Sequence, residues 1–142
     1  MTEQVQPITV EEWTMSGNQR NVQANLAANE HVLLGCEQEL CAELYVTAEF
    51  GPDGKNFSFE VSRYWATQLP EGVGTIRLKV GDDFDEQLTD VAITDGREHA
   101  VQGTGIVPTP FGKAEMTFTF IFNAPDKTVT MEAKKTLTHP LS

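Results

Sequence analysis

The sequence predicts an all-β domain, mainly antiparallel, built as a β-sandwich or a small β-barrel of about eight to ten strands. Apolar and polar residues alternate with a period of two over much of the chain, which is typical of strands with one face in a core. Turn residues recur at short intervals, and helical stripes of sufficient length are scarce. The 142 residues contain no linker, repeat or low-complexity tract, which indicates one β domain spanning 1–142. Neither observation distinguishes a sandwich from a barrel.

The first half of the chain contains both weak and strong strand patterns. Weaker strands are expected over 8–13 and 21–27, around a turn at 16–19. Residues 42–50 alternate strictly, and so do residues 57–62. The intervening GPDGK supplies the glycines and the proline of a turn, so these two runs are expected to form a hairpin.

In the second half, short strands are expected over 76–80 and over 90–94, the latter ending at the turn dipeptide Asp95-Gly96. The strongest signal in the chain lies over 116–122, where four large apolar residues share one face. The residues NAPDK then make a turn, and 129–133 continue as the returning strand.

Both cysteines lie in a segment where two interpretations compete. Good helix formers and apolar residues three and four apart predict a short helix near 36–44. Alternatively, a hairpin loop over 37–40 places Cys36 opposite Cys41, at a distance that a disulfide can span. One isolated pair lacks the further ligands of a structural zinc, and its spacing is not that of a Cys-x-x-Cys redox centre. In a reducing cytoplasm we expect two free thiols.

The charge of the chain narrows the range of partners. The net charge of −11 and the pI near 4.5 repel phosphate backbones, so nucleic acid is not an expected partner. Such an acidic surface favours solubility, or attraction to a basic partner protein. The N-terminus lacks the basic start and apolar run of a signal peptide, and no apolar run is long enough for a membrane span. We therefore expect a cytoplasmic protein without a membrane span.

Few residues suggest a metal site or a catalytic site. Five carboxylates gather within 82–90, but they do not follow the ligand spacing of a calcium loop, so a solvated acidic loop is expected there. For acid-base catalysis, the sequence permits only combinatorial pairs such as His99 with Asp95. No catalytic signature appears. Accordingly, no metal, no cofactor and no catalytic residue is assigned.

The glycines of QGTGIVPTPFGK, residues 102–113, do not make a phosphate loop, because no Ser or Thr follows Lys113 and no helical pattern follows. Gly103 and Gly105 share one face of the expected strand, which favours a bulge, a bend or the close approach of another backbone. Pro108 and Pro110 are expected to end that strand in a rigid loop.

Five residues are candidates for ligand or partner binding. Arg63, Tyr64 and Trp65 are consecutive, and these three residue types dominate interface hot spots, although Trp65 equally suits a core or a sheet edge. Phe118 and Phe120 mark either a core strand or the wall of a ligand site. The second face of their strand carries threonines and Ile121 in place of charges, which favours self-association, most simply as a homodimer.

The leading functional hypothesis is a non-enzymatic binding or assembly module with an acidic surface, which contacts another protein or itself. A second hypothesis is a small β-barrel that binds an apolar small molecule between the phenylalanine face and the strands near Phe57 and Phe59. A third is a barrel-type enzyme whose pocket groups are scattered in the sequence.

Overall fold

The structure is a computed structural model that describes residues 26 and 28–140. The strand expected over 8–13, the turn at 16–19 and nearly all of the strand expected over 21–27 lie outside the described residues.

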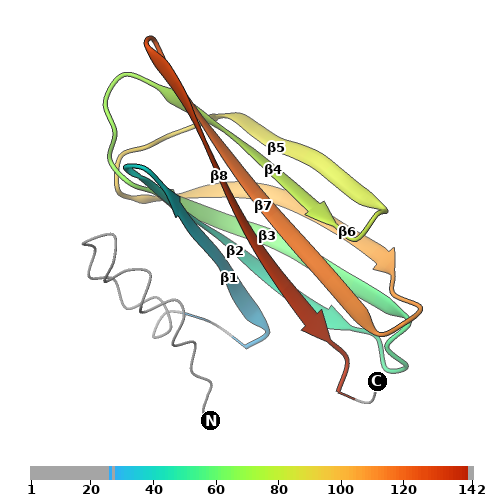
Figure 1. Ribbon diagram of the computed structural model, residues 1–142. Helices are drawn as coiled ribbons and strands as arrows, with labels where there is room; N and C mark the ends of the chain where they lie inside the picture. The colour runs from blue at the N-terminus through green and yellow to red at the C-terminus, as the bar shows by residue number, and fades with distance from the viewer. Residues whose placement is uncertain (1–25, 27, 141–142) are drawn as a thin grey trace.

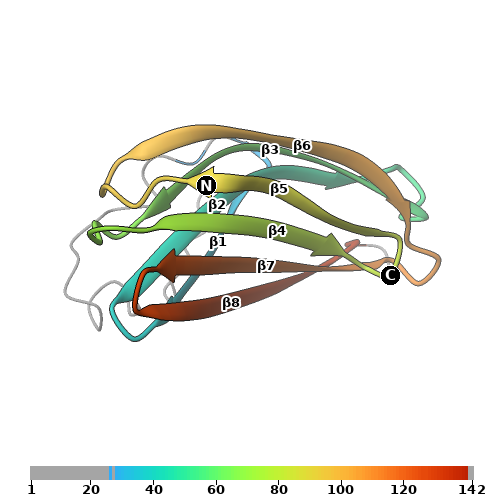
Figure 2. The same ribbon diagram turned by 90° about the horizontal axis from the view of Figure 1, so that it is seen from above.

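Within the described part of the chain, eight antiparallel strands form two four-stranded sheets that pack face to face (Figures 1 and 2). Sheet A has the order β1-β2-β3-β6, and sheet B has the order β5-β4-β7-β8. The strands are β1 (Glu30–Glu37), β2 (Leu40–Phe50), β3 (Asn56–Ala66), β4 (Val73–Val80), β5 (Phe84–Ala92), β6 (Glu98–Pro108), β7 (Lys113–Ala124) and β8 (Lys127–Thr138).

This arrangement confirms the all-β prediction and selects the sandwich. The barrel alternative is wrong, because the two sheets remain separate in their hydrogen bonding and do not close on each other. Among residues 28–140 no helix forms, and so none of the described residues belongs to a helix long and apolar enough to cross a membrane.

The short helix considered near 36–44 is also wrong. Leu40, Ala42 and Leu44 follow each other at alternate positions of β2 with no exposed surface, and all three belong to the core between the sheets. The free energy gained by burying these alternate side chains exceeds the free energy that the same residues would gain from their helical propensity, which is small by comparison. Gln38, with φ 57°, makes the turn from β1 to β2.

The expected hairpins are present, with longer strands. β2 and β3 pair across the GPDGK turn, where Gly54 has φ 74°, and β7 pairs with β8 over its whole length. The strand expected over 90–94 begins earlier, at Phe84. It was missed because β5 is an edge strand that is largely exposed on both faces, so its residues FDEQLTDVA do not alternate.

The core lies between the inward faces of the two sheets. Phe57 and Phe59 of sheet A meet the inward residues of β4 and β7 there. A Cβ at Gly103 would approach the Leu88 side chain to 2.7 Å, and a Cβ at Gly105 would approach the Phe59 ring to 2.8 Å. Between the pairs Val61↔Gly103 and Arg63↔Ala100, β6 has one residue more than β3, which makes a β-bulge in β6. The expected bulge is therefore confirmed, whereas the expected close approach of another backbone is wrong: the nearest atoms to both glycines belong to side chains, which need the space that a Cβ would take.

Candidate functional site

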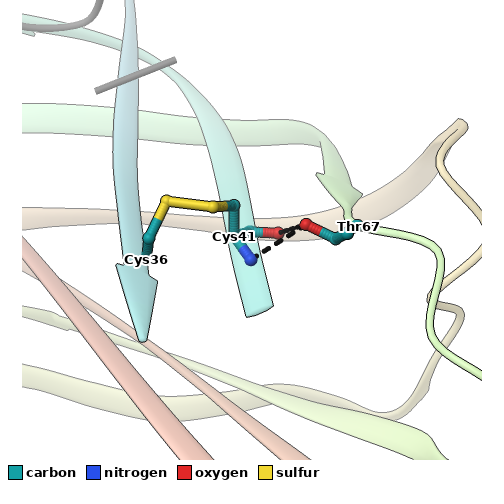
Figure 3. The surroundings of a disulfide bond; sticks show 3 residues. All are labelled: Cys36, Cys41 and Thr67. Carbon is teal, nitrogen blue, oxygen red and sulfur yellow. Dashed lines mark hydrogen bonds between the residues drawn. A yellow bond between two sulfur atoms is a disulfide. The ribbon is translucent and has the colours of Figure 1, made fainter. Parts of the chain in front are cut away.

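The cysteines are joined in a disulfide at the tip of the β1–β2 hairpin (Figure 3). Cys36 and Cys41 are direct cross-strand partners with Cα atoms 4.0 Å apart, so the expectation of free thiols is wrong. The Cys41 N–H donates to Thr67 Oγ1 at 2.9 Å, and the Thr67 hydroxyl donates to the Cys41 carbonyl at 3.1 Å. This arrangement ties the hairpin to the end of β3.

Location in the cytoplasm remains a prediction. Disulfides persist in oxidising compartments and are rare in the cytosol of most organisms. Trapping the thiols of Cys36 and Cys41 by alkylation before cells are opened would show which state the protein has where it works.

Arg63 and Trp65, two of the predicted anchors, lie on the face of sheet A that points away from sheet B. The Arg63 guanidinium stacks 4.0 Å over the Tyr45 ring, and it forms ion pairs with Glu30 at 3.3 Å and with Glu98 at 3.2 Å. Trp65 is only 4% exposed and packs in a second apolar cluster with Val32, Cys41 and Tyr45. Both side chains are therefore already engaged within the chain.

The third predicted anchor, Tyr64, points the other way, into the core between the sheets. Its hydroxyl accepts a hydrogen bond of 2.8 Å from the Ile93 N–H. Burial raises the pKa of this phenol, and the bond from Ile93 opposes that shift. Tyr64 thus fixes the segment that follows β5, and consecutive positions in the sequence do not make one surface here because side chains alternate along β3.

Phe118 and Phe120 have no exposed surface. Their ring centroids are 6.4 Å apart in an edge-to-face arrangement, and they share the core with Ile76 and Leu78 of β4. A hollow of about 290 Å³ on sheet A and another of about 240 Å³ at one end of the sandwich have linings that include neither ring. Phe118 and Phe120 therefore lie where the inward side chains of a core strand lie.

The acidic segment is divided between a turn and a strand. Asp82 and Asp83 lie in the turn after β4, whereas Asp85, Glu86 and Asp90 lie along β5. Asp85 accepts a hydrogen bond of 2.9 Å from Arg77. Within residues 28–140, no three His, Cys, Asp or Glu side chains gather in a way that could hold a metal ion.

The structure does bring His99 and Asp95 together. His99 Nε2 lies 2.8 Å from Asp95 Oδ1, which also accepts the Arg97 N–H at 3.0 Å. The hydrogen bond with His99 lowers the pKa of Asp95. The three residues close the turn before β6, so this pair has a structural task that needs no substrate.

The outer face of sheet B is the surface that the sequence indicated least completely. Near the start of β4, residues that pair across β4, β7 and β8 form rows that run perpendicular to the strands. Two of these rows contain no charged side chain. These rows are Val73–Asn123–Thr128 and Thr75–Ile121–Thr130. Val91, 66% exposed, and Ile93, 49% exposed, continue the surface at the end of β5, and Val73 is 48% exposed. We call these eight residues the sheet B patch.

Beyond the sheet B patch, the next two rows of this face are charged. One row joins Gln87, Arg77, Thr119 and Glu132, and the next joins Asp85, Lys79, Thr117 and Lys134. Sequence reasoning identified the threonines and Ile121 of β7 but missed Val91 and Ile93, because their bulged edge strand shows no alternation. The chain matches no protein-family model and no curated protein.

Proposed function

We propose that this protein is a non-enzymatic assembly module that forms a two-fold homodimer through the outer face of sheet B. The observation that carries this proposal is the sheet B patch, an uncharged area with exposed Val73, Val91 and Ile93 on a chain of net charge −11. Exposed apolar side chains gathered in an uncharged area, here together with Asn123 and three threonines, are typical of an interaction surface. Phe118 and Phe120 are buried in the core, which favours this function over binding of an apolar small molecule.

The size of the face suits a dimer. β7 and β8 have 12 residues each, β4 has 8 and β5 has 9. With strands about 4.8 Å apart and a rise of about 3.4 Å per residue, the face covers about 670 Å². This area falls within the roughly 600 to 1,000 Å² that each partner buries in a standard protein interface. The patch would form the uncharged end of this interface.

The distribution of charge supports the same surface. Four of the chain's ten lysines and arginines lie on this face: Arg77, Lys79, Lys113 and Lys134. Even with Asp90 of the β5 bulge counted, only four acidic residues accompany them. The face as a whole is therefore close to neutral, and two copies can approach there without the repulsion that the rest of the chain imposes.

The arrangement of charges also selects the direction of the two-fold axis. An axis along the strands places β5 over the partner's β8 and β4 over the partner's β7, with each row facing the same row. Asp85 of each copy then faces the partner's Lys134, and Thr75 faces the partner's Ile121. An axis across the strands would instead place the uncharged rows against the charged ones, which costs desolvation without pairing.

Light scattering over a hundredfold range of protein concentration around micromolar tests the proposal. The expected mass is twice the 15.7 kDa of one chain at the upper end of the range. The variant Ile121→Lys is expected to yield single chains, because it puts an unpaired charge among the uncharged rows of the interface. Ile106→Lys is the matched control: Ile106 is exposed on sheet A, so this variant should keep the wild-type mass. A wild-type mass of one chain throughout would contradict the proposal.

A further inference from the structure

A second exposed apolar surface lies at the end of β6, on the other sheet. Along IVPTPF the residues alternate between exposed and buried: Ile106 is 73% exposed, Val107 and Thr109 are buried, and Phe111 is 84% exposed. Pro108 and Pro110 are exposed as well. We call the exposed apolar residues of this segment, Ile106, Pro108, Pro110 and Phe111, the β6 strip.

The turn that carries Phe111 is firmly held. The Thr109 hydroxyl donates to the Gly54 carbonyl at 2.8 Å, and the Thr109 N–H donates to the Lys55 carbonyl at 2.8 Å. The Gly112 N–H donates to the Thr109 carbonyl at 2.9 Å, and the Gly112 carbonyl accepts the His139 N–H at 2.8 Å. Figure 2 shows the β2–β3, β4–β5 and β6–β7 connections gathered at this end of the sandwich.

This rigidity matters for binding energetics. Most of the cost of using a loop residue as a binding anchor is the conformational entropy lost when the loop becomes ordered. Two prolines and four hydrogen bonds already order the backbone of this turn in the folded chain, so Phe111 extends from a fixed backbone position at the surface. Core packing does not account for its position, because 84% of its surface faces water. An exposed aromatic side chain on an ordered turn is a candidate for an interface hot spot.

The surroundings of the β6 strip define the chemistry of a partner. Ile106 borders a hollow of about 290 Å³ on the outer face of sheet A. Glu49 and Glu60 line this hollow together with three hydroxyl side chains, those of Thr47, Ser58 and Thr104. Both glutamates are exposed, and among the residues that the structure describes no basic side chain lines the hollow. The carboxylate and hydroxyl oxygens beside the β6 strip can accept hydrogen bonds from the amine or guanidinium of a partner's lysine or arginine.

We propose that the β6 strip and the adjoining hollow bind a partner protein that inserts a lysine or arginine beside Glu49 and Glu60 and packs aromatic or aliphatic side chains against Phe111. This surface lies on sheet A and on the β6–β7 turn, so it remains accessible in a dimer built on sheet B. The protein would then act as a dimeric adaptor with two equivalent partner sites.

The partner can be replaced in a test by a random library of 12-residue peptides, selected on the immobilised full-length protein. Peptides that combine Lys or Arg with aromatic or aliphatic residues are expected to be enriched. Their dissociation constants, measured by fluorescence anisotropy, should rise at least tenfold with Phe111→Ser and with Glu60→Lys. Asp126→Lys, in the exposed β7–β8 turn and outside both surfaces, is the matched control for the change of charge and should leave them unchanged.

Three outcomes would overturn this proposal. They are the absence of any enriched peptide, enriched peptides without basic residues, and peptides whose binding is unaffected by Phe111→Ser. Because Phe111 is exposed, Phe111→Ser should melt at the wild-type temperature within about 2 °C, so a loss of binding cannot be attributed to unfolding. The dimer is tested separately by mass, so failure of either proposal leaves the other standing.

Discussion

Removing the disulfide between Cys36 and Cys41 should lower the stability of the sandwich by a defined amount. The bridge closes a loop of six residues, from 36 to 41, at the tip of the β1–β2 hairpin. In the chain-entropy model, a loop of this length contributes about 2 kcal/mol by restricting the unfolded chain. For a domain of this size, that corresponds to a fall in melting temperature of about 6 to 10 °C.

The appropriate variant is Cys36→Ser combined with Cys41→Ala. Cys36 is exposed and tolerates a hydroxyl, whereas Cys41 is buried and requires an apolar replacement. The hydrogen bonds of Thr67 are made to the backbone of Cys41, so they survive the substitution. The tie to β3 therefore stays intact, and the experiment measures the effect of the bridge.

Thermal unfolding followed by circular dichroism, with and without a reducing agent, provides the measurement. The oxidised wild type should melt about 6 to 10 °C above both the reduced wild type and the double variant, and the variant should not respond to the reducing agent. If the wild type shows titratable thiols before any reduction, or melts at the same temperature in both conditions, the reasoning about this hairpin is refuted.

Two further predictions concern the core and the β1 edge. Phe118→Ala should destabilise the fold by about 3 to 5 kcal/mol, as measured by urea unfolding, because Phe118 is fully buried; a change below 1 kcal/mol would show that its surroundings are not packed as described. Burial and the positive charge of Lys135 lower the pKa of His31 to about 4, against the weaker opposing effect of Glu30. Below pH 6.5 the unfolded chain therefore takes up a proton that the folded chain does not, and stability falls as the pH falls from 6.5 to 4. Partial access of solvent to the ring limits this effect to about 1 to 2 kcal/mol, and His31→Gln should remove it from the urea-unfolding profile; an unchanged profile would contradict the assignment.

The fold was predictable where one face of a strand is buried. Residues 42–50 and 116–122 alternate because their inward side chains fill the core, and the structure confirms both strands. β5 was only partly predictable because an edge strand has little buried surface to impose a pattern. The segment 36–44 was ambiguous because its local propensity favours a helix, while the contacts that make it a hairpin come from distant residues such as Thr67.

Surface residues were harder to predict than strands. Arg63, Tyr64 and Trp65 were chosen by residue type, but their environment depends on the alternation of side chains along β3 and on the neighbouring strands. Tyr64 faces the core, and Arg63 stacks on Tyr45, whose place beside it is set by the pairing of β2 with β3. Phe111 was not identified, because only the packed turn around it shows that its side chain has no place in the core.

A charge exchange between Asp85 and Lys134 tests the central claim, that the outer face of sheet B is a dimer interface with its axis along the strands. In that dimer, Asp85 of one copy faces the partner's Lys134, whereas within one chain they lie on the two edge strands of the sheet. Light scattering should show that Asp85→Lys and Lys134→Asp each weaken the dimer at least tenfold, because each puts like charges together. The double variant should recover a mass close to two chains. Single variants that keep the wild-type dimer, or a double variant as dissociated as the single ones, would contradict the account.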